Sequence, residues 1–246
     1  VMVAGCEEPA VKIAKDFYLS YELPGESVVL GKPCQKAGPL TAARLNGMAC
    51  HVHDFDDNSL MLLGHPSCVV LPAVLAAGEI AESSSEEAVL AYIMGVDITV
   101  MLAKGLFPEH YTRGWHSTAT LGIFGAAAAA SKLLALTEEE CCSALGLAAS
   151  GAAGVRGNNG SMGKCWQAGN AAQEGVACAL LAKRGFVTNP TAMDGTANYL
   201  FASSGEVDFE AIDQYMKNME SEFDRPGMAM KLYPCCKATH TSIDMI

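Results

Sequence analysis

The sequence has few aromatic and few basic side chains. Aromatic residues make up 7% of its 246 residues, so smaller side chains such as Ala, Gly and Met must fill the core, which favours closely packed helices over large β-sheets. Lys and Arg number 16 against 27 acidic residues, a formal net charge of −11. Because phosphate recognition needs a basic surface, this balance argues against nucleic-acid and acidic-membrane partners.

Signals for secretion and membrane insertion are also scarce. The ten cysteines are diluted over a long apolar chain, no secretory apolar segment stands at the start, and neighbouring pairs such as Cys235 with Cys236 lack C-x-x-C spacing. We therefore expect mostly buried, reduced cysteines and a cytoplasmic protein. The Ala-rich stretch 119–136 contains Gly122, Ser131 and Lys132, which predicts a buried helix and no membrane span.

The apolar spacing and the capping residues predict a mainly α protein. Pro72 is expected in the first turn of its helix, Thr137 as an N-cap and Gly185 as the glycine after a helix. Predicted helices cover 11–23, 41–50, 72–82, 85–105, 119–136, 141–150, 168–183 and 209–220; predicted extended pieces are 27–30 and 228–233, and predicted loops are 151–163 and 190–201. Since the chain lacks an initiator Met and stops inside what reads as a new helix, we expect a piece of a longer protein.

The first polar segment runs from Asn46 to Asp57 and is followed by His65. If 46–57 were helical, His51, Asp54 and Asn58 would share one face, and His53 and Asp57 another. Two interpretations stay open here. In the first, Asp56 and Asp57 cap helices and one His is a core residue. In the second, the protein is a metal-dependent hydrolase with a ligand cluster in this segment, although a helix would place those ligands on two different faces. That cluster would comprise His51, His53, Asp54 and Asp57.

Three later segments also place polar residues at helix ends or loops. His116 precedes Ser117, where an anion could meet free backbone N–H groups, although Ser117 as a plain N-cap explains the pattern equally well. Lys164 opens a helix, a position that disfavours Lys, but a P-loop is excluded because five residues separate Gly157 from Gly163 and Cys165 follows the lysine. The last segment carries Lys231, Tyr233 and His240 around a Tyr-Pro step, which also fits a simple strand-to-helix junction.

Together these segments resemble the MmgE/PrpD family. The shared motifs are N-G-x-x-x-H-x-x-D-F-D-D, H-P-S, G-x-H-x-T-A, a lysine before A-G-x-A-A, and K-x-Y-P-x-C-x-x-x-H, in that order. The resemblance implies a large all-helical domain, here residues 1–227, and the start of a small α+β lid domain, residues 228–246. It further implies a homodimer that needs no metal or organic cofactor and has a site between the two domains.

The resemblance also implies a function and its residues. The implied activity is a lyase acting on a small polycarboxylate, first of all dehydration of a 2-methylcitrate-like substrate, with decarboxylation of cis-aconitate or epimerisation of iminodisuccinate as alternatives. An inactive helical fragment is a further alternative. Asn58 departs from the Thr common in the family, which affects the expected substrate. The implied catalytic residues are Asp54, His65, His116, Lys164, Tyr233 and His240, and the implied substrate-binding residues are Asn58, Arg113 and Lys231.

Overall fold

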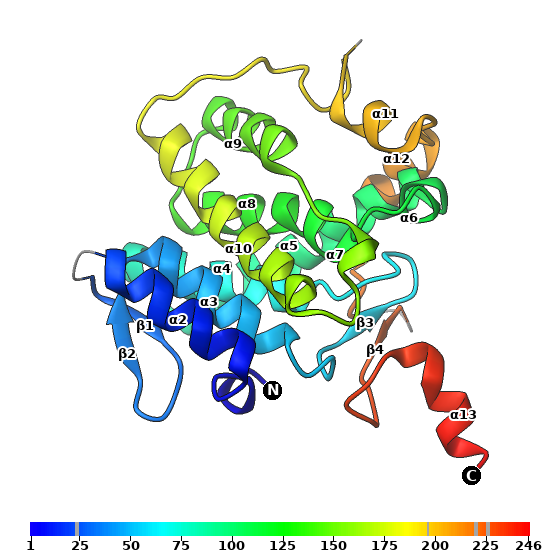
Figure 1. The fold of residues 1–246 in the computed structure, drawn as a ribbon. Helices are drawn as coiled ribbons and strands as arrows, with labels where there is room; N and C mark the ends of the chain where they lie inside the picture. Colours follow the sequence, from blue (N-terminus) through cyan, green and yellow to red (C-terminus); the bar gives the residue numbers. More distant parts are fainter. Residues whose placement is uncertain (23–24, 196, 219–220, 225–226) are drawn as a thin grey trace.

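The computed structural model describes residues 1–246 except 23–24, 196, 219–220 and 225–226. Helix accounts for 63% of the structure and strand for 5%, which confirms the prediction of a mainly α fold. The helices up to α12 form one body, and the C-terminal segment lies at its edge below β3 and β4 (Figure 1). The proposed division into domains at residue 228 stays a prediction.

The described part of the chain contains helices of very different length. The long ones are α2 (Pro9–Tyr21), α3 (Pro39–His51), α4 (Ser67–Ala81), α5 (Ser85–Leu106), α8 (Gly122–Leu133), α9 (Glu138–Gly151), α10 (Met162–Lys183) and α12 (Phe209–Asn218). The short ones are α1 (Met2–Gly5), α6 (Glu109–Thr112), α7 (Ser117–Thr120), α11 (Tyr199–Ser204) and α13 (His240–Asp244), with 3₁₀ turns at Arg156–Asn158 and Lys237–Thr239.

Strands are few and short among the residues that the structure describes. β1 (Ser27–Val29) pairs antiparallel with β2 (Gln35–Ala37). β3 (Asn58–Ser59) pairs antiparallel with β4 (Met228–Ala229), with Asn58 opposite Ala229 and Ser59 opposite Met228. This second pair joins segments about 170 residues apart in sequence and forms one border of the site described below.

The helix ends show where the sequence patterns were sufficient. Thr137 caps α9 in a reciprocal capping box with Glu140, and Gly185 follows α10 with a φ of +86°, both as predicted. The predicted helix start at Pro72 is wrong, because Pro72 lies inside α4, which begins five residues earlier. The helix has buried side chains both before and after this proline. The helix predicted over 119–136 is buried but divides into α7 and α8.

Other predicted boundaries shift by a few residues. α10 begins at Met162 and so takes in Lys164, while the strand predicted over 228–233 is limited to β4. The predicted loop 190–201 ends in α11, and the predicted loop 151–163 contains a 3₁₀ turn. The predicted ends at Leu23 and at residues 219–220 lie outside the described residues.

The centre of the fold is the crossing of α10 with α3 and α8. Gly47 of α3 faces Gly169 of α10, and a Cβ on Gly47 would lie 2.9 Å from the Cα of Gly169. A Cβ on Gly169 would collide with the Arg44 carbonyl oxygen and with Met48. The prediction of a core built from small residues on close helices is therefore confirmed. One turn beyond the crossing, α3 ends at His51 close to the start of α10.

Helix α5 is long and apolar enough to cross a membrane by length and composition alone. Half of its most apolar stretch is buried inside the fold, and the helix packs against α4, α8 and α12. Burial against these neighbours accounts for its apolar composition.

Candidate active site

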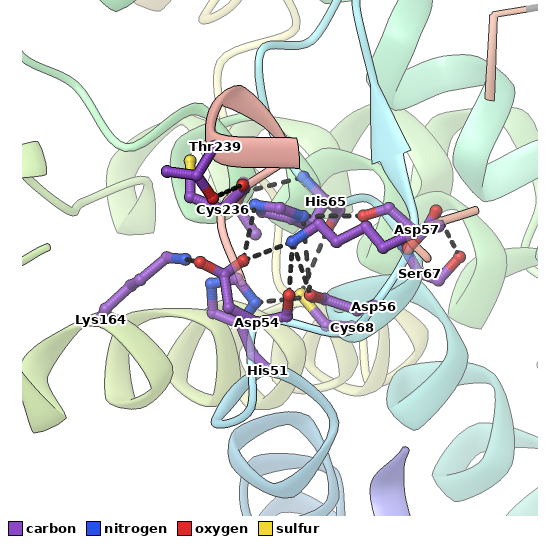
Figure 2. A network of polar contacts seen from close by, with 12 residues as sticks. His51, Asp54, Asp56, Asp57, His65, Ser67, Cys68, Lys164, Cys236 and Thr239 are labelled. Atoms are coloured by element: carbon purple, nitrogen blue, oxygen red, sulfur yellow. Dashed lines mark hydrogen bonds and ion pairs between the residues drawn. The ribbon is translucent and has the colours of Figure 1, made fainter. Parts of the chain in front are cut away.

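The site begins where α3 ends. The chain leaves the helix after His51, and Asp54 takes a left-handed conformation with a φ of +50°, which Asp tolerates better than most residues. A helix continuing through residue 57 would separate His51 from Asp57, but this helix does not form. The helix assumed in the split-face argument is therefore wrong, and His51, Asp54 and Asp56 reach the same polar cluster (Figure 2). His53 nevertheless stays apart from His51, because it contacts Glu8.

Asp54 is the centre of that cluster and pairs with two lysines from distant segments. The Lys231 Nζ lies 2.5 Å from Asp54 Oδ1, and the Lys164 Nζ lies 2.9 Å from Asp54 Oδ2. Burial raises the pKa of Asp54, but the hydrogen bonds from Lys231 and Lys164 outweigh it and bring that pKa to about 2. Asp54 is therefore a carboxylate at neutral pH, and the Lys231 side chain is fully buried against it.

Asp56 holds the second buried negative charge. Its Oδ2 lies 2.6 Å from His51 Nδ1, and its Oδ1 lies 3.6 Å from His65 Nδ1 and 3.9 Å from Lys231 Nζ. Burial raises the pKa of Asp56, yet the neighbouring His51, His65 and Lys231 hold it well below its usual range. Asp56 thus fixes the His51 ring, which stacks 5.7 Å from the His116 ring and lies 5.0 Å from the His65 ring.

His65 is buried at the start of the segment that leads into α4. Its Nδ1 donates to the Asp57 carbonyl oxygen at 2.7 Å, so its Nε2 carries the lone pair and lies 3.6 Å from Asp54 Oδ1. The Thr118 hydroxyl accepts a hydrogen bond from the His65 backbone N–H. Burial lowers the pKa of His65 to about 4, so the ring is neutral near pH 7 and can accept a proton next to Asp54.

His116 is oriented by a chain of hydrogen bonds. The Gln167 side-chain N–H donates to the Val155 carbonyl oxygen, which turns Gln167 Oε1 toward His116 Nδ1 at 2.8 Å. His116 Nδ1 therefore carries the proton, and Nε2 is a buried lone pair with no hydrogen-bond partner among the described residues. Burial, reinforced by the neighbouring His51 and Lys164, lowers the pKa of His116 to about 3.

His65, His116 and Lys164 border a cavity of about 280 Å³. Of the residues implied by the resemblance, Asn58, His65, His116 and Lys164 line it. Asp54 borders a neighbouring cavity of about 340 Å³ together with His51, and Lys164 lines both cavities. The other residues that line the first cavity are Leu60, Leu63, Tyr111, Thr118, Arg156, Asn159, Cys236, Lys237 and Ala238.

The structure does not bring Arg113, Tyr233 or His240 to this lining. Arg113 is exposed, and its guanidinium lies over Gly205 after α11. The Tyr233 hydroxyl donates to Asp244 at 2.7 Å, and its ring contacts the buried His240 ring at 5.0 Å. Lys231 is also away from the lining, because it is buried behind Asp54. Of the last segment, only Cys236, Lys237 and Ala238 reach the cavity.

The cluster contains side chains that can act as metal ligands. Asp54, Asp56 and His65 present ligand atoms within 4.8 Å of one another, as do His51, Asp56 and Cys68. The Lys231 ammonium, however, lies 2.5 Å from Asp54 and 3.9 Å from Asp56, so a fixed positive charge already stands among these carboxylates. A divalent cation would have to displace this buried ammonium, so the residues do not fit a metal well.

Comparison with known proteins decides the family. The model of the MmgE/PrpD N-terminal domain matches residues 1–212. The chain belongs to the MmgE/PrpD family. Cis-aconitate decarboxylase from Mus musculus is 30% identical over 231 residues, which cover 91% of this chain and 46% of the relative. The Homo sapiens enzyme of the same name is 30% identical over 239 residues, covering 94% and 49%.

A third relative has the same name. Cis-aconitate decarboxylase from Aspergillus terreus is 29% identical over 239 residues, which cover 93% of this chain and 49% of the relative. This MmgE/PrpD chain therefore spans about half the length of the curated relatives it matches.

The sequence of this MmgE/PrpD chain does not reveal every residue of the site. A helix through residue 57 predicts His51 and Asp56 only as metal ligands, caps or core residues. Gln167 could have been found from its place three residues after Lys164, on the same face of α10. Arg156 and Tyr111 carry no such signal, because a loop and a short helix bring them together only in three dimensions.

Proposed function

We propose that the protein carrying this MmgE/PrpD chain is a lyase that acts on a small polycarboxylate. The observation that carries the proposal is the pair of buried neutral imidazoles, His65 and His116, around one cavity that Lys164 also lines. Breaking a bond next to a carboxylate needs a proton acceptor or donor and nearby positive charge. These residues supply both.

We propose decarboxylation of a cis-aconitate-like acid as the leading reaction, supported by the names of the three relatives. In that reaction the C–C bond to one carboxylate breaks, CO₂ leaves, and the electron pair stays on the remaining unsaturated diacid. One proton is then added to carbon. A histidine that has taken a proton from water supplies it, and the Lys164 ammonium offsets the negative charge that develops on the substrate.

Substrate binding would prepare the histidines for this step. Neutral imidazoles with pKa values of about 4 and about 3 cannot donate a second proton at pH 7. Carboxylates entering the cavity favour the protonated ring and so raise both pKa values. His65 has a further carboxylate, Asp54, 3.6 Å from its Nε2, so we assign it as the proton donor. His116 is the base where the reaction also removes a proton from carbon, as in the dehydration considered next.

Dehydration of a 2-methylcitrate-like substrate is the second candidate. It needs a base at one carbon and an acid at the departing hydroxyl, and the two separate imidazoles around one cavity favour it. Decarboxylation needs only one proton donor, so the presence of a second imidazole is a reason to retain dehydration as a candidate. Cytoplasmic location and a homodimer belong to the same proposal.

The test uses the full-length protein that carries this chain. Citrate, 2-methylcitrate, cis-aconitate and iminodisuccinate are incubated with it separately and followed by proton NMR. We expect one of the tricarboxylates to be consumed, and its product distinguishes loss of CO₂ from loss of water. Consumption of none of the four would contradict the proposal.

A chelator series tests the metal-dependent rival. We expect turnover to survive dialysis against EDTA, because Lys231 already compensates the Asp54 and Asp56 charges. Activity that vanishes and returns with added zinc, manganese or iron would instead support the hydrolase interpretation. The truncated chain run beside the full-length protein tests whether residues 1–246 alone are an inactive scaffold.

A further inference from the structure

The cluster around Asp54 is close to neutral as a whole. Two lysines, Lys164 and Lys231, balance the two carboxylates of Asp54 and Asp56, and His65 and His116 are neutral. A polycarboxylate brings two or three negative charges into the cavity, where they are partly removed from water. Part of the positive charge that compensates them must therefore come from side chains outside this cluster.

Three cationic side chains line the cavity among the residues that the structure describes. They are Lys164, which is already paired with Asp54, and Arg156 and Lys237, which are not part of that cluster. No carboxylate within the described ranges pairs with Arg156. Arg156 therefore contributes uncompensated positive charge to the lining.

The Arg156 side chain is held in place rather than free to move in solvent. Its guanidinium carbon lies 3.9 Å from the centre of the Tyr111 ring, and its Nη1 donates to the Tyr111 carbonyl oxygen at 2.8 Å. Stacking on an aromatic face leaves the in-plane donors on the remaining nitrogens available to a ligand. A guanidinium in this state is suited to a planar carboxylate.

The backbone of Arg156 is fixed relative to His116. The His116 N–H donates to the Gly154 carbonyl oxygen at 3.1 Å, and the Arg156 N–H donates to the Gly114 carbonyl oxygen at 2.8 Å. A β-bridge between Trp115 and Val155 lies between these two bonds. The same pair of bridged backbone segments thus sets the positions of the imidazole and the guanidinium.

We propose that Arg156 binds the third carboxylate of a tricarboxylate and makes this cavity prefer tricarboxylates to dicarboxylates. This inference rests on the proposed function. Lys164 has three N–H donors, so it can stay paired with Asp54 and still donate to one substrate carboxylate, and Lys237 can donate to a second. A dicarboxylate can therefore be bound without Arg156. A tricarboxylate without Arg156 would leave one carboxylate in the cavity with no cationic partner.

The experiment measures binding of two unreactive acids, tricarballylate and glutarate, to the full-length protein by titration calorimetry. We expect the wild type to prefer tricarballylate by about tenfold or more, the scale of one charge-assisted hydrogen-bonded contact. Arg156→Met should reduce the preference to about threefold or less, mainly by weakening tricarballylate, and Arg156→Lys should retain part of it.

Arg184→Met is the matched control, because Arg184 is exposed after the end of α10, does not line the cavity and should leave the preference unchanged. An equal loss for both acids in Arg156→Met would indicate a structural role for Arg156 and would overturn the inference. So would an unchanged preference in that variant, and both results leave the proposed lyase intact if the wild type still turns over its substrate. Absence of wild-type binding to both acids together with absence of turnover would overturn the inference and the proposed function.

Discussion

The helical core and the segment between α3 and α4 are stabilised in different ways. The core is apolar and depends on close approach, as at Gly47 and Gly169. The segment 52–66 is irregular and buries carboxylates, which depend on lysines 110 and 177 positions further along the chain (164 − 54 and 231 − 54). Substitutions that disturb close packing should therefore destabilise the core, and substitutions that remove a charge should destabilise the site.

The largest effect is expected from Lys231→Met. This change leaves the buried carboxylates of Asp54 and Asp56 without their most buried cation, and removal of one partner of a buried ion pair costs about 3–5 kcal/mol. Urea unfolding followed by circular dichroism measures the loss. Lys217→Met, at an exposed position of α12, is the control and should change stability by about 0.5 kcal/mol or less. A similar small change for both variants would show that the site does not depend on this charge pair.

Next in size is the effect of His116→Gln on turnover. We expect a loss of about 10²-fold or more in kcat, the scale for removing a general acid or base, which corresponds to about 2.7 kcal/mol. Since Gln cannot accept a proton at the position of Nε2, binding should change less than kcat. His53→Gln is the matched control, because His53 contacts Glu8 and does not line the cavity. If the two variants have equal activity, His116 is not part of the chemistry.

A packing change tests the other half of the comparison. Gly169→Ala places a Cβ against the Arg44 carbonyl oxygen and should cost about 1–3 kcal/mol, the usual scale for overpacking. Gly78→Ala, in α4, meets only ordinary contacts at 3.9 Å and 4.0 Å and should stabilise the helix by about 0.5–1 kcal/mol. Thermal unfolding of both variants gives the comparison. Equal melting temperatures would remove the argument for a close α3–α10 crossing.

The smallest effect concerns pH. His65 and His116 have pKa values of about 4 and about 3 in the folded protein, below the usual ~6.5, so the unfolded chain binds more protons between these values. Each of these histidines should therefore destabilise the fold as pH drops from ~6.5 toward ~4, by about 1 kcal/mol at pH ~5.5. Burial raises the pKa of Asp57 to about 7, which acts in the opposite direction over this range, so the histidine effect is measured as the difference between wild type and His116→Gln. The slope should decrease in His116→Gln. An identical slope in wild type and variant would place a protonated His116 in the folded state.

The fold was largely predictable because its signals are local. Thr137 with Glu140 and Gly185 mark helix ends through hydrogen bonds to the nearest turn, and the apolar spacing of 85–105 is a property of one helix. The prediction at Pro72 is wrong because burial of α4 can offset the destabilisation that a proline causes inside a helix. No local sequence pattern reveals that burial. The strand that begins at Met228 has only two residues, because its partner β3 offers only two residues to pair with.

The site was predictable where motifs carried it and unpredictable where long-range contacts did. Asn58, His65, His116 and Lys164 were identified from motifs, and the structure places them around one cavity. The resemblance implies a substrate-binding role for Arg113, three residues before His116, but the left-handed Gly114 follows Arg113 and the Arg113 side chain lies over Gly205. Arg156 occupies the cavity instead, because the Trp115–Val155 bridge sets that loop beside His116.

The pairing of β3 with β4 has a consequence for the order in which the molecule folds. Two residue pairs hold Asn58 and Ser59 against Met228 and Ala229, and the buried Lys231 joins the same two segments through Asp54. These contacts close a loop of about 170 residues, whose closure entropy must be overcome first. The α3 and α10 helices can form and meet without this pair. We therefore expect the cavity to reach its final shape late, after the helical body has formed.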